Sequence, residues 1–395
     1  MSYSEHHIPV KGEIRVKCAT KKKDATIVFK VVDNALPAIL GLASCEELGL
    51  INRVQSVSVN SDHVTPEVFK GLGCLKNFVY VIDLIDTPSF KIIPARRIPY
   101  ATRDAVKTEL DRMVNLEVIK PISEPTPAVS PMVIVRKNNG KLRICMDPTE
   151  LNKNNKRRHY PMKTVEEIAA KIGKSKFFTK LDCSSGFWQI RVSERTQKYL
   201  TFSTPWGRYS CLRIPFGISS APEVFTEAMN ELTKGLENVE CAMDDLFIHA
   251  ESQEQLNKYT QKLIERIQSA GLTLNKEKCV FSVTSLRFLG HIFCQDGIKI
   301  DPEKNEAIHR LSVRTDKKKL MRLLGMVTYL NKFIPNLSII TEPLRLQLKK
   351  DVEWIWESIH QDAFEQIKRV LSSTPVLRYY DVNAEIKLYT QALPP

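Results

Sequence analysis

Residues 177–190 read FFTKLDCSSGFWQI, and residues 240–250 read ECAMDDLFIHA. The first stretch is a short apolar strand that ends in Asp182, and the second is a pair of apolar strand segments that meet at Asp244 and Asp245. A tight turn places its side chains beyond the end of a sheet, while the flanking apolar strands stay in the core. We therefore expect two acidic strand ends, 62 residues apart in the chain, at one end of a sheet.

Adjacent carboxylates of this kind are typical of a divalent-cation site. They repel each other unless a cation lies between them. Magnesium is a hard ion that takes oxygen ligands and keeps positions open for phosphate. A pair of such ions activates an attacking hydroxyl and stabilises a leaving pyrophosphate. An isolated Asp-Asp turn is far more often a solvated turn than a metal site, so the surrounding sequence decides between the two.

The surrounding pattern mixes strands and helices. An Asn-Gly pair at 139–140 joins the strand-like runs MVIVRK and KLRICMD and predicts a hairpin. Thr164 and Glu167 form a capping-box pattern at the start of a helix. Helices are predicted over 103–119, 164–172, 219–236 and 252–271, and the chain after residue 300 is mostly helical.

Charge and composition narrow the class of protein. The net charge of +13 favours a polyanionic partner such as nucleic acid, although a merely basic globular protein has the same charge. Residues 136–163 hold nine Lys or Arg against two acids, and residues 301–350 hold eleven against five. No apolar run is long enough to span a membrane, and the first 11 residues lack a signal core. Nine scattered cysteines with no C-x-x-C pair do not fit a zinc site and fit a reducing compartment.

Six motifs in a fixed order carry a family resemblance. They are KLRICMDPTELNK (141–153), FFTKLDCSSGFWQI (177–190), GRYSCLRIPFGISSAPEVF (207–225), AMDDLFI (242–248), LTLNKEKCVFSVTSLRFLGHIF (272–293) and LLGMVTYLNKFIPNLS (323–338). Together they resemble the reverse transcriptases of Ty3/gypsy-type LTR retrotransposons, from about residue 90 to the end. The resemblance implies an α+β right-hand polymerase fold, with fingers, palm and thumb around an antiparallel palm sheet.

The same resemblance divides the chain into parts. Residues 101–300 would be the fingers and palm of a reverse transcriptase, and 301–350 its thumb. Residues 1–50 resemble the C-terminal part of a retropepsin-like protease, and 51–100 are expected to be a linker. Residues 351–395 would be a connection region and the truncated first strand of an RNase H domain.

Both ends of the chain depart from the families they resemble. VVDNALPAILGLASCEELGLI (31–51) carries the protease resemblance, but the Asp-Ser/Thr-Gly loop is missing. In IKLYTQALPP (386–395), Gln391 stands where the RNase H family has its first metal-binding Asp. We therefore predict neither protease nor RNase H activity, and we expect the chain to be a fragment, a processed product or a decayed copy of a Pol polyprotein.

The resemblance implies catalytic and metal-binding roles for three residues. Asp182 and Asp244 would be the principal metal ligands, and Asp245 would support the site. The cofactor would be two Mg²⁺ ions, with Mn²⁺ as a substitute. The activity would be RNA-directed DNA polymerisation, the addition of dNTPs to a primer.

A nucleotide pocket is also implied. Phe187 would exclude a 2′-hydroxyl by a clash, and the alternative is that it is an ordinary core residue. Basic side chains of the predicted hairpin would hold the triphosphate, since Arg offers paired donors to phosphate and Lys a point charge. The nucleotide-binding set is Arg136, Lys137, Lys141, Arg143, Phe187, Phe216 and Gly217. The alternative for the four basic residues is a solvated hairpin.

The tip of the acidic turn departs from the family pattern. Ala242 stands where the family has Tyr, and Met243 follows it; these residues would seat the primer end. The lost Tyr side chain is expected to reduce activity. It motivates an alternative function, a catalytically decayed remnant that only binds nucleic acid. A cellular RNA-binding protein is a third reading, but it gives no reason for the acidic turn or for Phe187.

The expected partners follow from the leading reading. They are an RNA or DNA template–primer duplex, dNTPs and other Pol or Gag products, with no membrane. The expected location is the cytoplasm, within a virus-like particle.

Overall fold

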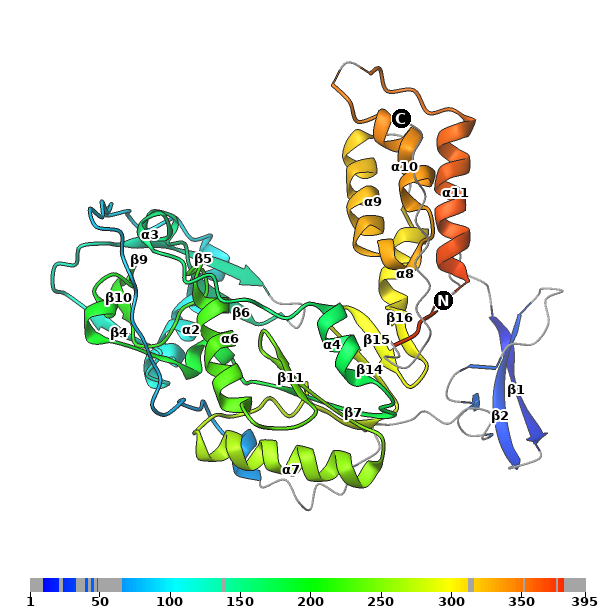
Figure 1. Cartoon of the computed structure of the whole chain (residues 1–395), viewed down its shortest axis with the longest axis horizontal. Coiled ribbons are helices and arrows are strands. Elements are labelled where there is room, and N and C mark those ends of the chain that lie inside the picture. The colour runs from blue at the N-terminus through cyan, green and yellow to red at the C-terminus, as the bar shows by residue number, and fades with distance from the viewer. Residues whose placement is uncertain are drawn as a thin grey trace, which may run out of the picture. The chain divides into compact units, whose positions relative to one another are not determined.

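A computed structural model provides the fold of the chain, shown in Figure 1. It describes residues 10–20, 24–32, 40–41, 44–45, 48, 66–136, 140–311, 316–350, 352–373 and 376–379. The chain divides into two compact units, residues 1–58 and 59–395. Among the described residues, no helix is both long enough and apolar enough to cross a membrane.

The first unit contains a two-stranded ribbon. Strands β1 (Val10–Ala19) and β2 (Asp24–Val32) pair antiparallel. Ile27 is buried, whereas several apolar side chains of the ribbon, such as Ile14, are exposed. Most of residues 31–51, on which the protease resemblance depends, lie outside the described residues.

Residues 66–100 belong to the second unit and pack into its core. Val68, Tyr80 and Ile82 are buried there. Strand β3 (Val79–Tyr80) pairs in parallel with β8 (Arg191–Val192). The expectation of a linker over 51–100 is therefore wrong for this part. Proline-rich, irregular sequence conceals the packing, because the contacts are made with residues more than 100 positions away.

A five-stranded sheet with the order β4-β10-β9-β5-β6 follows. Its strands are β4 (Ile119–Ile122), β5 (Ser130–Arg136), β6 (Leu142–Met146), β9 (Thr201–Thr204) and β10 (Gly207–Cys211). The antiparallel pairing of β5 with β6 confirms the predicted hairpin. Short helices α3 (Thr149–Asn154) and α5 (Glu194–Gln197) lie between strands of this sheet along the chain.

Helix α2 (Arg103–Asn115) ends earlier than predicted. Glu117 has a φ of 52°, a left-handed conformation that stops a helix, and the Val118 N–H bonds to the Met113 carbonyl at 2.9 Å. The apolar residues after it continue into β4. Val118 has helical spacing with the apolar residues of α2, but it lies outside the helix. When a strand follows a helix at once, the apolar pattern of the helix can continue into the strand.

The sheet that carries the acidic turn, here called the central sheet, has four antiparallel strands in the order β11-β12-β7-β13. They are β7 (Phe177–Asp182), β11 (Val239–Ala242), β12 (Asp245–Ala250) and β13 (Val280–Val283). Helices α6 (Ala221–Thr233) and α7 (Gln253–Ser269) pack against it, and α7 runs along the sheet in Figure 1. The predicted strand–turn–strand and both helices are confirmed.

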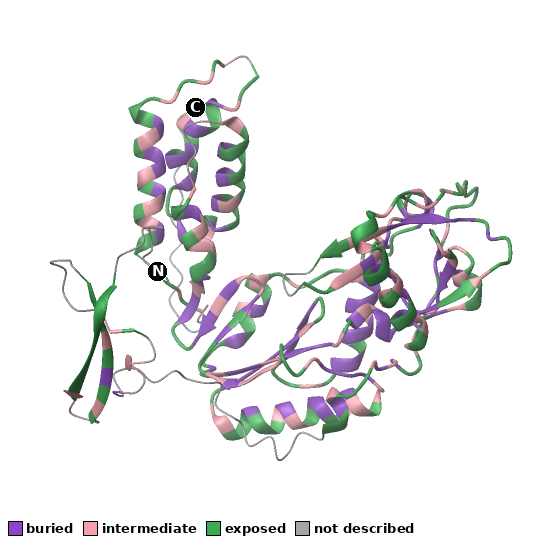
Figure 2. Cartoon of the chain, turned by 180° about the vertical axis from the view of Figure 1, so that it is seen from behind, coloured by how far each residue is buried: buried purple, intermediate pink, exposed green. Residues whose placement is uncertain are grey.

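Both faces of the central sheet are covered. Successive side chains of a strand point to opposite faces. Accordingly, Leu246 and Ile248 of β12 lie in one core, while Phe247 between them lies in a second core shared with the C-terminal helices. Figure 2 shows these strands largely in the buried colour.

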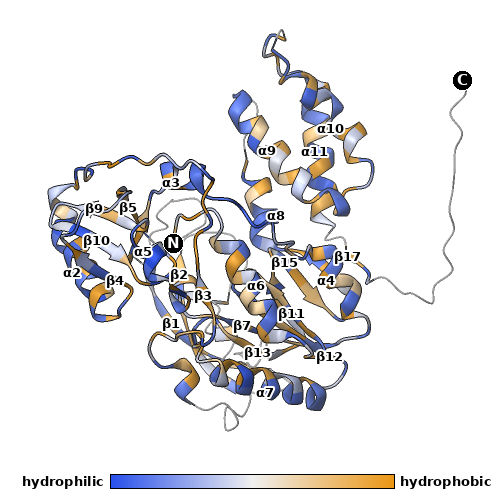
Figure 3. Cartoon of the chain, turned by 60° about the vertical axis from the view of Figure 1, so that its left-hand side comes forward, coloured by the Kyte–Doolittle hydropathy of each residue, from blue (hydrophilic) through white to orange (hydrophobic). Residues whose placement is uncertain are grey.

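The second core joins the central sheet to a C-terminal group of elements. Strands β14 (Ser285–Phe288), β15 (His291–Cys294), β16 (Gly297–Ile300) and β17 (Val376–Leu377) form a further antiparallel sheet. The helices that contribute to the second core are α4 (Val165–Ile172), which precedes β7, and the C-terminal helices α8 (Pro302–His309), α9 (Lys317–Tyr329), α10 (Leu337–Leu346) and α11 (Ser358–Ser372). Hydrophobic and hydrophilic residues alternate along α9 in Figure 3, as in an amphipathic helix.

A buried histidine on β12 makes stability depend on pH. His249 is 1% exposed, its Nδ1 lies 2.8 Å from Ser175 Oγ, and its Nε2 has no partner. Burial lowers the pKa of His249 from 6.5 to about 4. Below pH 6.5 the unfolded chain therefore binds a proton that the folded chain does not bind, so the stabilising effect of neutral His249 is complete above pH 6.5 and is lost as the pH falls toward 4.

We expect the free energy of unfolding to fall by about 2 kcal/mol between pH 7 and pH 5 through this residue. Guanidinium unfolding at both pH values measures the difference. His249→Gln should reduce it, whereas the same change at the exposed His309 should not. An equal pH dependence in wild type and His249→Gln would contradict the assignment.

Candidate active site

The register of the central sheet brings the predicted acidic residues to one end. Asp182 is the last residue of β7 and lies directly opposite Asp245, the first residue of β12. Asp244 precedes Asp245 in the turn, and its carbonyl accepts a hydrogen bond from the Cys183 N–H at 3.3 Å. The predicted convergence of two acidic strand ends is therefore present in the structure.

The turn itself is strained. Met243 has a φ of 56° and is 53% exposed. A residue with a Cβ pays a steric cost in this region, and such strain is tolerated where the surrounding structure enforces it. The covered strands β11 and β12 supply that enforcement. Ala242, before the turn, is buried and faces the second core.

Two lysines neutralise part of the acidic cluster. Lys278 Nζ lies 3.1 Å from Asp182 Oδ2 and 3.3 Å from Oδ1. Lys180 Nζ lies 3.7 Å from Asp245 Oδ1. Burial raises the pKa of Asp182 above its ordinary value, Lys278 opposes this, and the charge of Asp244 adds to the rise. Burial also raises the pKa of Asp245, and Lys180 opposes it.

The donor chemistry fits a hard divalent cation. Carboxylate oxygens are the ligands that Mg²⁺ takes. A cation between Asp182 and Asp245 would offset the burial, and the lesser effect of neighbouring like charges, that raise the pKa of both groups. Within the described part of the chain, no three acidic, His or Cys side chains already surround one point. Asp182 and Asp245 share one end of the sheet, and each is paired with a lysine.

An aromatic cluster involves the segment that follows the acidic end of β7 along the chain. Phe187 is part of the 3₁₀ helix η4 (Gly186–Gln189), directly after β7. Its ring centroid lies 5.5 Å from that of Phe216 and 5.8 Å from that of Phe225. Phe187 is half-buried, so its ring is fixed on two sides and still accessible.

The residues that follow Phe187 have a structural role. Trp188 is buried, and Gln189 is fully enclosed. Gln189 Nε2 donates to the Ser184 and Thr273 carbonyls, and the Thr273 N–H donates to Gln189 Oε1, each at 2.8 Å. This side chain links the segment after β7 to the one before β13. The sequence offers no signal for this link, since Thr273 is 84 residues from Gln189 in the chain.

Two of the predicted nucleotide-binding residues join the aromatic cluster. The Arg143 guanidinium lies 4.6 Å from the Phe216 ring centroid, and its buried Nε has no partner. Gly217 has a φ of 114°, and a Cβ there would collide with the Met146 carbonyl. Glycine is therefore required where this loop passes β6.

The other basic candidates are less defined. Arg136 ends β5 and is exposed, and Lys141 precedes β6 and is also exposed. Lys137 lies outside the described residues. The structure thus brings Arg143, Phe216 and Phe187 together, while Arg136 and Lys141 lie near the solvent end of the hairpin.

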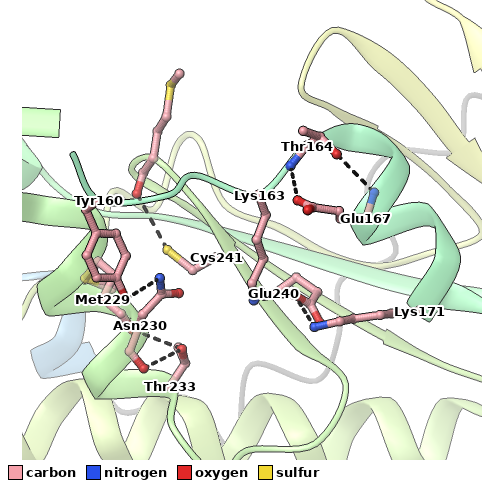
Figure 4. A network of polar contacts seen from close by, with 11 residues as sticks. Tyr160, Lys163, Thr164, Glu167, Lys171, Met229, Asn230, Thr233, Glu240 and Cys241 are labelled. Atoms are coloured by element: carbon pink, nitrogen blue, oxygen red, sulfur yellow. Dashed lines mark hydrogen bonds and ion pairs between the residues drawn. The ribbon is translucent and has the colours of Figure 1, made fainter. Parts of the chain in front are cut away.

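A buried acid that the sequence analysis did not single out lies on β11 (Figure 4). Glu240 is 6% exposed at its side chain and pairs with Lys163 at 2.6 Å and Lys171 at 3.1 Å. The capping box of Thr164 and Glu167 begins α4 between the two lysines, as predicted. In the sequence, Glu240 can be noticed as a charged residue inside an apolar strand. Lys163 therefore pairs with Glu240 and is not a free cation of the basic segment 136–163.

Part of the chain is similar to a known protein family. Residues 127–293 match the reverse transcriptase (RNA-dependent DNA polymerase) family. The chain carries a reverse transcriptase domain. Asp182, Asp244 and Asp245 all lie within the matched residues.

Relatives of this reverse transcriptase domain occur in transposon polyproteins. The transposon Tf2-3 and Tf2-7 polyproteins of Schizosaccharomyces pombe are each 36% identical over 264 residues, which are 66% of this chain and 20% of each polyprotein. The chain therefore spans about a fifth of the length of these relatives. The predicted family is confirmed.

Solved structures show the same fold. A foamy viral protease-reverse transcriptase in complex with dsDNA has a TM-score of 0.74 at 20% identity, covering 82% of this chain and 68% of that chain. A dRH form in complex with ds DNA has a TM-score of 0.73 at 18% identity, covering 93% of this chain and 70% of that chain. These likenesses confirm the predicted polymerase fold of mixed α+β class.

Proposed function

We propose that the reverse transcriptase domain adds dNTPs to the 3′ end of a primer, copying an RNA or DNA template. The observation that carries the proposal is the register of Asp182 with Asp245, which lie directly opposite each other at the end of the central sheet. The family match and the transposon relatives support the same activity.

Asp182 and Asp244 are proposed as the principal ligands of two Mg²⁺ ions, with Asp245 in support. Bound there, the ions would activate the primer hydroxyl and stabilise the leaving pyrophosphate. The chain itself contributes the position of the carboxylates: β7 and β12 are held by buried side chains on both faces, so the strand ends keep their separation. Mn²⁺ has the same preference for oxygen ligands and would substitute.

The nucleotide is proposed to lie against the aromatic cluster. Arg143 would hold the triphosphate, because its Nε has no partner and its guanidinium is kept in place by the Phe216 ring. Arg136, Lys137 and Lys141 would add positive charge from the hairpin. Phe187 would lie below the sugar, and Gly217 would allow close backbone approach.

The template–primer duplex is the proposed macromolecular partner. Foamy viral protease-reverse transcriptase has been solved with dsDNA and with an RNA/DNA hybrid. Met243 is exposed at the turn and would meet the primer end, with Ala242 supporting it from the core. Helices α8 and α9, within the proposed thumb over 301–350, would contact duplex phosphates, so binding should weaken as salt rises.

The remaining parts of the chain keep the proposals made from sequence. Residues 1–50 would be a protease remnant, and 351–395 a connection region with the truncated start of an RNase H domain; residues 380–395 lie outside the described residues. Phe364 and Ile367 of α11 are buried in the second core, which supports a packing role for the apolar residues there.

The direct experiment is primer extension on poly(rA)/oligo(dT) with dTTP and Mg²⁺. The proposal requires incorporation that depends on both template and divalent cation. Duplex binding without any extension, by protein shown to be folded, would instead favour the remnant that only binds nucleic acid.

A further inference from the structure

Lys278 contacts the Asp182 carboxylate more closely than a mobile surface lysine would. Its ammonium is within hydrogen-bonding distance of both oxygens of the Asp182 carboxylate, at 3.1 and 3.3 Å. The carboxylate is 7% exposed, whereas the lysine side chain is 60% exposed. The ammonium therefore approaches a buried acid from the solvent side.

The backbone around Lys278 is tied to Asp182 on both sides. The Asn275 N–H donates to the Asp182 carbonyl at 2.8 Å, and the Asp182 N–H points to Cys279 Sγ at 3.4 Å. The Lys278 N–H in turn donates to the Asn275 carbonyl at 3.1 Å. This short turn is thus anchored to the strand end, and the lysine it carries is directed to the carboxylate by the local fold.

A divalent cation and this ammonium need the same oxygens. Mg²⁺ binds carboxylate oxygens at about 2.1 Å, and a Lys ammonium that contacts both oxygens occupies the same approach. Coulomb repulsion between the two cations further disfavours their binding at the same time. The repulsion is strong because the protein shields one side of the site from solvent. Since the lysine is mostly exposed, it can move away without unfolding the turn.

We propose that Lys278 competes with divalent cations for Asp182, holding the carboxylate until a cation displaces it. The inference rests on the proposed function, in which Asp182 is a metal ligand. Its consequence is that the protein alone binds divalent cations weakly, and that the ions enter together with the triphosphate, whose negative charge offsets the repulsion. Lys278 would then limit metal loading without nucleotide.

The test measures Mn²⁺ binding to the full chain by electron paramagnetic resonance, without nucleotide or duplex. Lys278→Ala is expected to bind Mn²⁺ about three- to tenfold more tightly than wild type, since removing a partly shielded ion pair is worth about 1 kcal/mol. Lys276→Ala is the matched control: it removes the same charge from the same turn, and Lys276 is exposed with no carboxylate partner among the described residues. It should change the affinity less than twofold.

Two further variants separate the possible outcomes. Lys278→Arg keeps a cation on the carboxylate and should bind Mn²⁺ no more tightly than wild type, which excludes a general loosening of the turn as the cause. Asp182→Asn should remove the tighter binding seen in Lys278→Ala. Equal Mn²⁺ affinity in wild type and Lys278→Ala, with loss on Asp182→Asn, would overturn the competition and leave the proposed function intact. Binding that is indifferent to Asp182→Asn would overturn both.

Discussion

Asp182→Asn is expected to lower the rate of dNTP incorporation by roughly a thousandfold or more. The substitution keeps the size of the side chain and removes the charge that a divalent cation requires. Loss of a metal that stabilises charge in the transition state removes several kcal/mol, and each 1.4 kcal/mol is about a tenfold change in rate. Single-turnover primer extension with saturating dTTP measures the effect.

The fold should survive this substitution. Burial raises the pKa of Asp182, so its ionised form opposes folding at neutral pH, and a neutral Asn removes that cost. We expect a melting temperature equal to or higher than that of wild type. Asp111→Asn, at an exposed position of α2, is the matched control and should keep wild-type incorporation. Undiminished synthesis by Asp182→Asn would show that Asp182 does not hold a catalytic metal.

Phe187→Val is expected to raise incorporation of ribonucleotides relative to deoxyribonucleotides by about a hundredfold. The Phe187 ring is held against Phe216 and Phe225, so it cannot turn aside from a 2′-hydroxyl. A rigid clash of this kind can contribute about 3 kcal/mol of discrimination, which corresponds to that ratio. The measurement is kcat/KM for UTP and for dTTP on one template–primer.

In this experiment, kcat/KM for dTTP serves as the control for kcat/KM for UTP. If Phe187 lies under the sugar, kcat/KM for dTTP should change little while that for UTP rises. If Phe187 is an ordinary core residue, its truncation leaves a cavity and both values should fall together. An unchanged ratio would therefore assign Phe187 to packing and contradict the proposed sugar contact.

The acidic end of the central sheet could be predicted from sequence because its signals are local. Alternating apolar residues on both sides of Asp244 specify a strand–turn–strand, and the apolar run before Asp182 specifies a strand that ends there. Register then follows from burial, since a slip of one residue would turn Phe247 away from its core. The helix α4 was predictable for the same reason, through its capping box.

Other features depend on contacts between distant parts of the chain. The irregular, proline-bounded sequence over 51–100 is typical of a linker, yet the Cys74 N–H bonds to the Gly271 carbonyl and the Leu75 N–H bonds to the Gln189 carbonyl, both at 2.7 Å. Lys278 gave no sign of its pairing with Asp182, because a lysine in a polar turn is usually solvated. Glu240 was visible as a charge within an apolar strand, but its two lysine partners lie more than 65 residues away.

The most direct measurement is anomalous diffraction from Mn²⁺ in crystals of the chain with template–primer and a non-hydrolysable dNTP. We predict two manganese peaks at the end of the central sheet, with Asp182 and Asp244 as ligands and the Lys278 side chain moved away from the carboxylate. A nucleotide bound in the crystal with no manganese at Asp182 would contradict it.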